Sequence, residues 1–151
     1  MAVLDGAKRD EKPSSVATIL ERELQPAIKE WLRRVNLLPA LTRIPLSDDD
    51  RTRHLAKLFH DLICRLRLVK GTHLLLSTAA NEHGQRRRLQ GYSPAMLVEE
   101  SRLFQVVTFR TLHLHVGELD PHQLLRDVMI IADEVDLQLM HAVRCWETSV
   151  A

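Results

Sequence analysis

The sequence contains little of the material from which β-sheets are usually built. Aromatic residues make up 4% of its 151 positions and there are only 5 glycines, although 45% of the residues are hydrophobic. Strands are enriched in aromatic residues, and glycine is common in the tight turns that join them. The composition therefore argues against an all-β fold, whereas the length suffices for one domain with a hydrophobic core.

Net charge is also nearly absent, because 21 lysines and arginines are balanced by 20 aspartates and glutamates, for a formal charge of +1. This balance creates no overall field that would attract nucleic acid or an anionic membrane. No apolar run reaches the roughly 18 residues that a membrane-spanning helix needs. We therefore expect no nucleic-acid partner and no membrane insertion.

The two cysteines, Cys64 and Cys145, are too few for the disulfide framework of a secreted protein, and no signal peptide opens the chain. The sequence also has no phosphate-binding loop, no Rossmann glycine pattern, no Gly-x-Ser-x-Gly elbow and no His-Glu-x-x-His helix. These absences favour a non-enzymatic, cytoplasmic protein of bacterial type.

Apolar residues recur at spacings of three and four along most of the chain, which is typical of amphipathic helices. The spacing predicts an all-α fold, a bundle of five or six helices for which a globin-like arrangement without haem is one option. The expected helices run over residues 16–35, 48–70, 72–90, 94–116 and 121–147. We expect residues 1–14 to form a flexible leader, 15–147 a single domain and 148–151 a tail.

Capping residues and helix breakers set these limits. Ser15, Ser47, Ser93-Pro94 and Asp120-Pro121 can each begin a helix, and glycines at 71, 91 and 117 can each end one. Pro26 lies within the first helical pattern, so we expect it to kink or split that helix.

The stretch "NEHGQRRRLQGYSPAMLVEE", residues 81–100, predicts a hairpin of two helices that turns at Gly91. His83, Gly84 and Arg87 share one face of the first helix, and Gly84 would let a neighbouring backbone come close. Glu100 lies on the apolar stripe of the second helix, at nearly the same height as His83. We therefore expect a buried polar cluster of His83, Arg87 and Glu100, because an inward carboxylate needs partners.

Two interpretations of this cluster remain open. It can be an ion pair that fixes the register of the hairpin, or a polar pocket in which a helical domain binds or senses a small ligand. Catalysis is not indicated, since no nucleophile or second base is placed beside the cluster.

Two histidine–cysteine pairs, His60 with Cys64 and His141 with Cys145, have the spacing of helical zinc ligands. The helical angles argue against a shared site, because each pair lies away from the apolar face of its helix. The few aromatic residues also leave little to line a haem pocket. We therefore expect neither a metal nor a cofactor.

The last expected helix is apolar on two sides. Its main stripe includes Ile131 and Val135, and a second stripe of Ile130, Leu137 and Met140 lies roughly opposite. A helix with two apolar sides is either central to a bundle or part of a subunit interface. We predict a homodimer and take the second stripe as its candidate interface.

Several segments resemble a known family. They are "PLSDDDRTRHLAKLFHDLICRLR", "ANEHGQRRRLQGYSPAMLVEESRLFQ" and "RDVMIIADEVDLQL", and the most telling parts are His83-Gly84 with Arg87, Gly91-Tyr92, and Leu97-Val98 with Glu100. Over about residues 15–146 the chain resembles the N-terminal domain of RsbRD-type proteins, the RsbT co-antagonists of the bacterial stressosome. It is also similar to the N-terminal sensor domain of many bacterial histidine kinases.

The resemblance implies an all-helical regulatory domain without haem, commonly a dimer, that passes a signal to a C-terminal output partner. In such proteins the partner is a STAS domain or a histidine kinase. No such domain follows the last helix in this sequence, so we expect a separate partner or one attached beyond Ala151.

Overall fold

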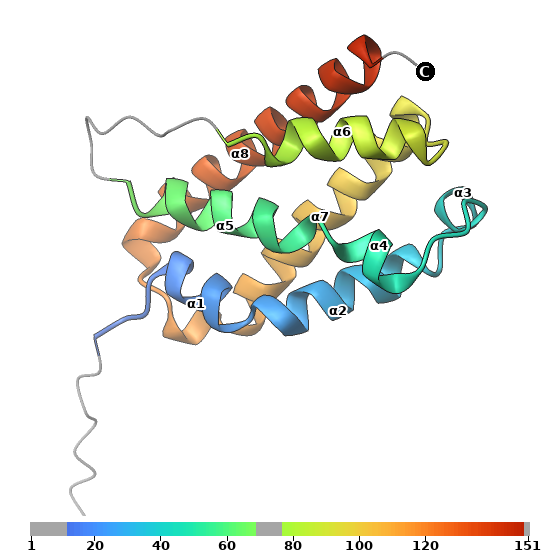
Figure 1. Ribbon diagram of the computed structural model, residues 1–151. Coiled ribbons are helices and arrows are strands. Elements are labelled where there is room, and N and C mark those ends of the chain that lie inside the picture. Colours follow the sequence, from blue (N-terminus) through green and yellow to red (C-terminus); the bar gives the residue numbers. More distant parts are fainter. Residues whose placement is uncertain (1–11, 69–76, 150–151) are drawn as a thin grey trace, which may run out of the picture.

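The computed structural model describes residues 12–68 and 77–149 and is built from helices (Figure 1). This confirms the predicted all-α bundle. The helices are α1 (Val16–Arg22), α2 (Leu24–Val35), α3 (Pro39–Thr42), α4 (Asp48–Thr52), α5 (Leu55–Leu66), α6 (Ala79–Leu89), α7 (Pro94–Leu114), the short 3-10 helix η1 (Val116–Glu118) and α8 (Pro121–Thr148).

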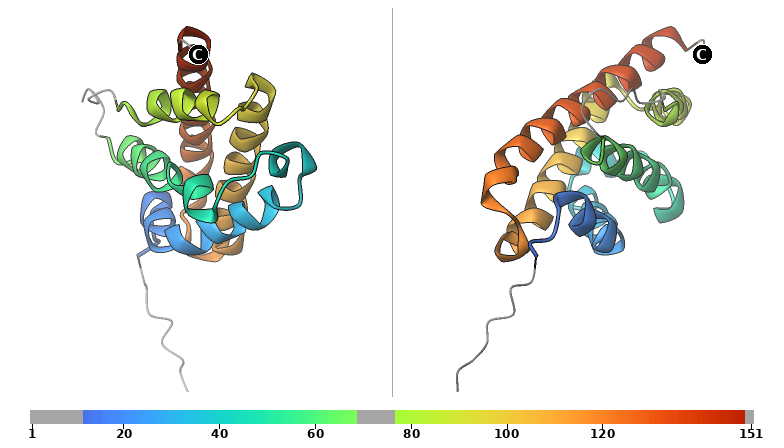
Figure 2. Two further views of the ribbon diagram at one scale, coloured as in Figure 1. Left: turned by 45° about the vertical axis from the view of Figure 1, so that its right-hand side comes forward. Right: turned by 90° about the vertical axis from the view of Figure 1, so that its left-hand side faces the viewer.

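The two longest helices, α7 and α8, run antiparallel and form one layer (Figure 1). Helices α1, α2, α4, α5 and α6 lie together on one side of this layer (Figure 2). The core fills the space between, where Trp31 and Phe59 are fully buried and the rings of Phe59 and Phe104 lie 4.5 Å apart. Within the described ranges, none of the helices combines the length and the apolar character needed to cross a membrane.

The first predicted helix is split as expected, although the break falls at Glu23 and not at Pro26. Pro26 is the third residue of α2. Its missing N–H costs nothing there, because the first turn of a helix has no intrahelical acceptors for its N–H groups. Pro26 therefore lies in the first turn of α2 and does not itself break the helix.

The second predicted helix is also divided, because the chain turns at Arg53 and His54 between α4 and α5. The third begins at Ala79, later than predicted, since Ser77 and Thr78 are not helical. Residues 69–76, with Gly71 and the predicted start at Thr72, lie outside the described residues.

The last two helices begin where the sequence places them. Ser93 Oγ accepts a hydrogen bond from the backbone N–H of Met96, and the Asp120 carboxylate accepts one from the N–H of His122 at 2.9 Å. The predicted leader is only partly described, since residues 1–11 lie outside the described ranges. Its last residue is held in place, because the N–H of Ser14 donates to the carbonyl of Glu118 at 2.8 Å.

Candidate functional site

The corner between α6 and α7 turns at Gly91, whose φ of 93° lies in the left-handed region. Side chains other than glycine rarely adopt this conformation, and Gly91 is the residue predicted for the turn. The N–H of Tyr92 then donates to the carbonyl of Arg87 at 2.9 Å, and Ser93 caps α7. Because the connection is short, residues of α6 and α7 that are equally far from the turn lie opposite each other.

The structure brings together the three side chains proposed for the polar cluster. Glu100 is 3% exposed, and its Oε2 lies 3.1 Å from His83 Nε2 and 3.1 Å from Arg87 Nε. Arg87 Nη2 is also 3.1 Å from Oε1, although its N–H does not point at that oxygen. A single buried carboxylate therefore joins one residue four and another eight positions before Gly91.

Arg87 connects three helices through the remaining N–H groups of its guanidinium. Nη2 donates to the carbonyl of Arg51 at 2.7 Å, and Nη1 donates to the side chain of Gln90 at 2.8 Å and to the carbonyl of Asp50 at 3.4 Å. Although only 1% exposed, the guanidinium is thus hydrogen-bonded through all three of its nitrogens, which offsets the cost of burying its charge. The contacts hold α4 against the α6–α7 corner.

Tyr92, the residue after Gly91, contacts two buried arginines. The Arg87 guanidinium lies 4.7 Å from the centre of its ring, and its hydroxyl accepts a hydrogen bond from Arg51 Nη1 at 3.1 Å. Burial raises the pKa of the Tyr92 hydroxyl, so the group stays neutral. Arg51 is itself 3% exposed and donates to the carbonyl of Ile44 at 2.7 Å. Sequence analysis did not identify this second buried arginine.

The charges within the cluster are settled by burial and by hydrogen bonds. Burial lowers the pKa of His83 and so favours its neutral ring. Burial alone would raise the pKa of Glu100, but the hydrogen bond from His83 and the charge of Arg87 outweigh it and lower that pKa. An ionised carboxylate can only accept, so His83 Nε2 carries the proton and donates to Glu100.

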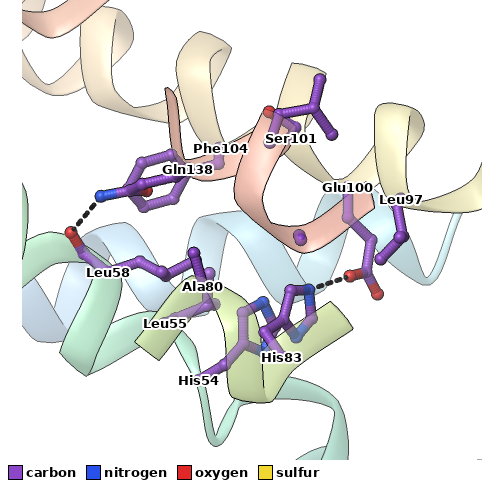
Figure 3. Close-up of a pocket in the computed structure, with 12 residues that line it drawn as sticks. His54, Leu55, Leu58, Ala80, His83, Leu97, Glu100, Ser101, Phe104 and Gln138 are labelled. Carbon is purple, nitrogen blue, oxygen red and sulfur yellow. Dashed lines mark hydrogen bonds and ion pairs between the residues drawn. The ribbon is translucent and has the colours of Figure 1, made fainter. Parts of the chain in front are cut away.

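A second histidine, His54, belongs to the cluster and was missed from the sequence. Its ring stacks on that of His83, with ring centres 3.6 Å apart and planes 9° from parallel (Figure 3). The edge of the Trp31 ring system meets it from α2, with centroids 5.6 Å apart. Burial, followed by the charge environment of His83 and Arg87, lowers the pKa of His54 well below its usual value.

Gly84 occupies the tightest contact between α6 and α8. A Cβ atom at this position would lie 2.0 Å from the carbonyl oxygen of Ala142, which is far below any van der Waals contact. Glycine is therefore required for the two helix backbones to approach this closely. The contact fixes α8 beside the buried cluster, as the predicted packing face implies.

A cavity of about 30 Å³ lies between α5, α6, α7 and α8. Its polar lining comes from His54, His83, Glu100, Ser101 and Gln138, and Figure 3 shows the histidine rings at its edge. This volume has room for about two water molecules. Ligand pockets for small organic molecules are roughly ten times larger. The cavity therefore gives no support to the small-ligand interpretation of the cluster.

Three groups that could bind a metal come close together, since ligand atoms of His54, His83 and Glu100 lie within 4.8 Å of one another. Their arrangement does not suit an ion. Parallel stacked rings direct their nitrogen lone pairs along parallel planes and not toward one point, and Arg87 already neutralises the carboxylate.

The proposed zinc ligands are not gathered into one site. His60 Nε2 lies 3.4 Å from Cys64 Sγ on α5, whereas His141 and Cys145 are on α8. In the described part of the chain, the three groups beside the cavity are the only cluster of three or more potential ligands.

The candidate interface residues on α8 are only partly exposed. Ile130 and Met140 are half-buried, and Leu137 is 36% exposed. The most exposed apolar side chains of this helix are Leu125 at 72% and Met129 at 66%, which sequence analysis did not single out. Their spacing of four residues was the available signal.

Comparison of the chain with protein-family models, with curated proteins and with solved structures finds no match. The resemblance to RsbRD-type domains therefore stays a prediction, and so does the globin-like arrangement.

Proposed function

We propose that this chain is a non-enzymatic bacterial signalling domain that works as a homodimer. In this account the outer face of α7 and α8 joins two copies, and the end of α8 passes a signal to an output domain, attached or separate. A histidine kinase or a STAS domain is the kind of output partner that the family resemblance implies. The observation that carries the proposal is an apolar seam on this outer face.

The seam is formed by apolar residues that share one face of each helix, at spacings of three, four or eleven positions. It comprises Val98 on α7 with Leu125, Met129, Ala132 and Val143 on α8, all of them exposed or half-buried, and the half-buried Phe109 of α7, which also packs against the core. Helices α1, α2, α4, α5 and α6 lie together on one side of the α7–α8 layer (Figure 2). Val98, Leu125 and Met129 are 48%, 72% and 66% exposed, so no described part of the chain covers them.

Two antiparallel helices with an apolar outer seam can pair with a second copy to complete a four-helix arrangement. A two-fold dimer is also the commonest symmetric assembly and uses the same surface on both copies. Two charged residues interrupt the seam, Arg102 between Val98 and Phe109 on α7 and Asp136 between Ala132 and Val143 on α8. A water-exposed seam of this kind is costly in a monomer, which supports association.

The end of α8 is tied to the buried corner. The indole N–H of Trp146 donates to the carbonyl of Tyr92 at 2.7 Å, and the Arg88 guanidinium lies 4.4 Å from the centre of the Trp146 ring. Arg88 also donates to the carbonyl of Trp146. A change in the position of the corner would therefore reach the last turn of α8, which supports this helix as the route to the output domain.

Sedimentation velocity tests the proposal. We expect the unmodified chain to sediment as a dimer at micromolar concentration, and Met129→Arg to sediment as a monomer, because a charge in the seam would be buried without a partner. Leu37→Arg is the matched control, since Leu37 is 67% exposed but lies in the turn after α2. A monomer at all accessible concentrations of the unmodified chain would remove the proposal.

A further inference from the structure

The stacked pair of His54 and His83 joins two elements that are not continuous in the sequence. His54 lies at the turn between α4 and α5, whereas His83 is within α6. Their ring centres are 3.6 Å apart, and His83 is 8% exposed. Separation of the two rings therefore removes a contact between the beginning of α5 and α6.

The pair also stands between the interior and the solvent. Both rings line the cavity of about 30 Å³, and both line an open cleft of about 100 Å³ on the surface between α4, α5 and α6. His54 is half-buried, and it lines the cleft that opens to solvent. Water in the cleft can thus bring protons to the pair without unfolding the domain.

The charged groups around the pair can compensate the positive charge of one added proton but not that of two. Glu100 from α7 and Arg87 from α6 lie behind the rings and neutralise each other. The groups that face the histidine pair from α2 and α8 are uncharged. They are Trp31 on α2 and Gln138, Leu139 and Ala142 on α8.

The walls of the cleft carry more positive than negative charge. Its charged residues besides Arg87 are Asp50, Arg53, Lys57, Glu82 and Arg86. Asp50 pairs with Arg53 at 3.0 Å and with Arg86 at 3.8 Å, and Glu82 pairs with Lys57 at 3.7 Å. None of these acids is free to neutralise a doubly protonated histidine stack.

We propose that the His54–His83 stack is a proton-binding site, and that its protonation separates the two rings and loosens α4 and α5 from the α6–α7 corner. One added proton makes one ring cationic, and the Glu100 carboxylate beside His83 offsets that charge. A second one would put two cations face to face beside Arg87, and their repulsion opens the stack. The proton-binding site does not depend on the proposed function. Only its role does, because acidification would be a signal that this domain passes on.

The sign of the pH effect follows from burial. Both rings have a pKa below the usual 6.5, so the folded chain binds fewer protons than the unfolded chain once the pH falls below that value. Stability is therefore complete above about pH 6.5 and is lost as the pH falls through the lowered values. Glu100, whose pKa is lowered from a model-compound value of 4.5, adds its own loss only at more acidic pH.

Denaturant unfolding at about pH 7 and about pH 5 tests the site. We expect the unfolding equilibrium constant of the unmodified chain to rise at least about tenfold over this range. In His54→Phe, which keeps a stacking ring but cannot bind a proton, we expect this rise to shrink about tenfold or more. His113→Gln is the control, because His113 is exposed and should leave the pH dependence unchanged. Equal pH dependence in His54→Phe and in the unmodified chain would overturn the proposal.

An NMR titration of the histidine ring protons in the unmodified chain keeps the test decisive if His54→Phe does not fold. The proposal expects two rings that remain neutral well below the pH at which the exposed histidines titrate, and a change in the Trp31 signals when they protonate. Two rings that titrate like the exposed ones, with no change at Trp31, would contradict it. Neither measurement depends on dimer formation, so a monomeric chain would refute the proposed function without deciding this question.

Discussion

The α6–α7 corner and the outer face of α7 and α8 reverse the usual distribution of side chains. The corner buries an arginine and a glutamate, Arg87 and Glu100, which are 1% and 3% exposed. The outer face leaves Leu125 and Met129 mostly exposed to water, at 72% and 66%. One helix, α7, contributes to both regions, with charge on its inner side and part of an apolar seam on its outer side.

The two regions differ in whether the chain itself supplies partners for their side chains. Each of the three nitrogens of the Arg87 guanidinium donates a hydrogen bond, and Glu100 neutralises its charge, so the corner is charge-compensated within one chain. Such a pair adds little net stability, but removing one partner leaves an uncompensated buried charge. No described residue covers the exposed apolar side chains of the outer seam. The corner therefore specifies the fold, and the seam is where we place the partner.

The largest expected effect is on the corner. Glu100→Gln should destabilise the folded chain by about 3–5 kcal/mol, because it leaves the buried Arg87 guanidinium without a counter-charge. Chemical denaturation measures this free energy. Glu99→Gln is the matched control on the same helix, since Glu99 pairs with Arg102 at the surface and should cost less than about 1 kcal/mol. Equal small losses in both variants would show that the corner carries no structural charge pair.

A smaller effect is expected where α6 meets α8. Gly84→Ala should cost about 1–3 kcal/mol, because its Cβ would meet the Ala142 carbonyl and the two helices would have to move apart. Gly117→Ala provides the comparison, since nothing lies within 4 Å of a Cβ at Gly117. Thermal unfolding of the two variants would measure the difference. If Gly84→Ala were as stable as Gly117→Ala, the α6–α8 contact would be looser than described.

Local signals in the sequence sufficed for the corner. Gly91 and Ser93-Pro94 limit the two helices, and counting residues outward from the turn puts His83 and Glu100 at one height. Gly84 could be recognised for the same reason, because a small residue on an apolar helical face indicates close packing. These features depend on residues within one hairpin, where spacing alone decides which side chains meet.

The remaining parts of the site depend on contacts that helical spacing does not encode. His54 and Arg51 reach the corner because the chain turns between α4 and α5, a break for which the sequence has neither glycine nor proline. The first break was misplaced for a related reason, since a proline in the first turn of a helix costs little. Which apolar side chains of α8 stay exposed depends on how α5, α6 and α7 pack against it, and helical spacing alone does not show this.

Chemical cross-linking tests the central claim, that the outer seam joins two copies, most directly. In a chain with Cys64→Ser and Cys145→Ser, a single cysteine would be introduced as Met129→Cys or, as the control, Leu37→Cys, both at exposed apolar positions. With a short bismaleimide, the account predicts covalent dimers from Met129→Cys and few from Leu37→Cys. Equal yields from the two positions, or no dimer from Met129→Cys, would contradict it.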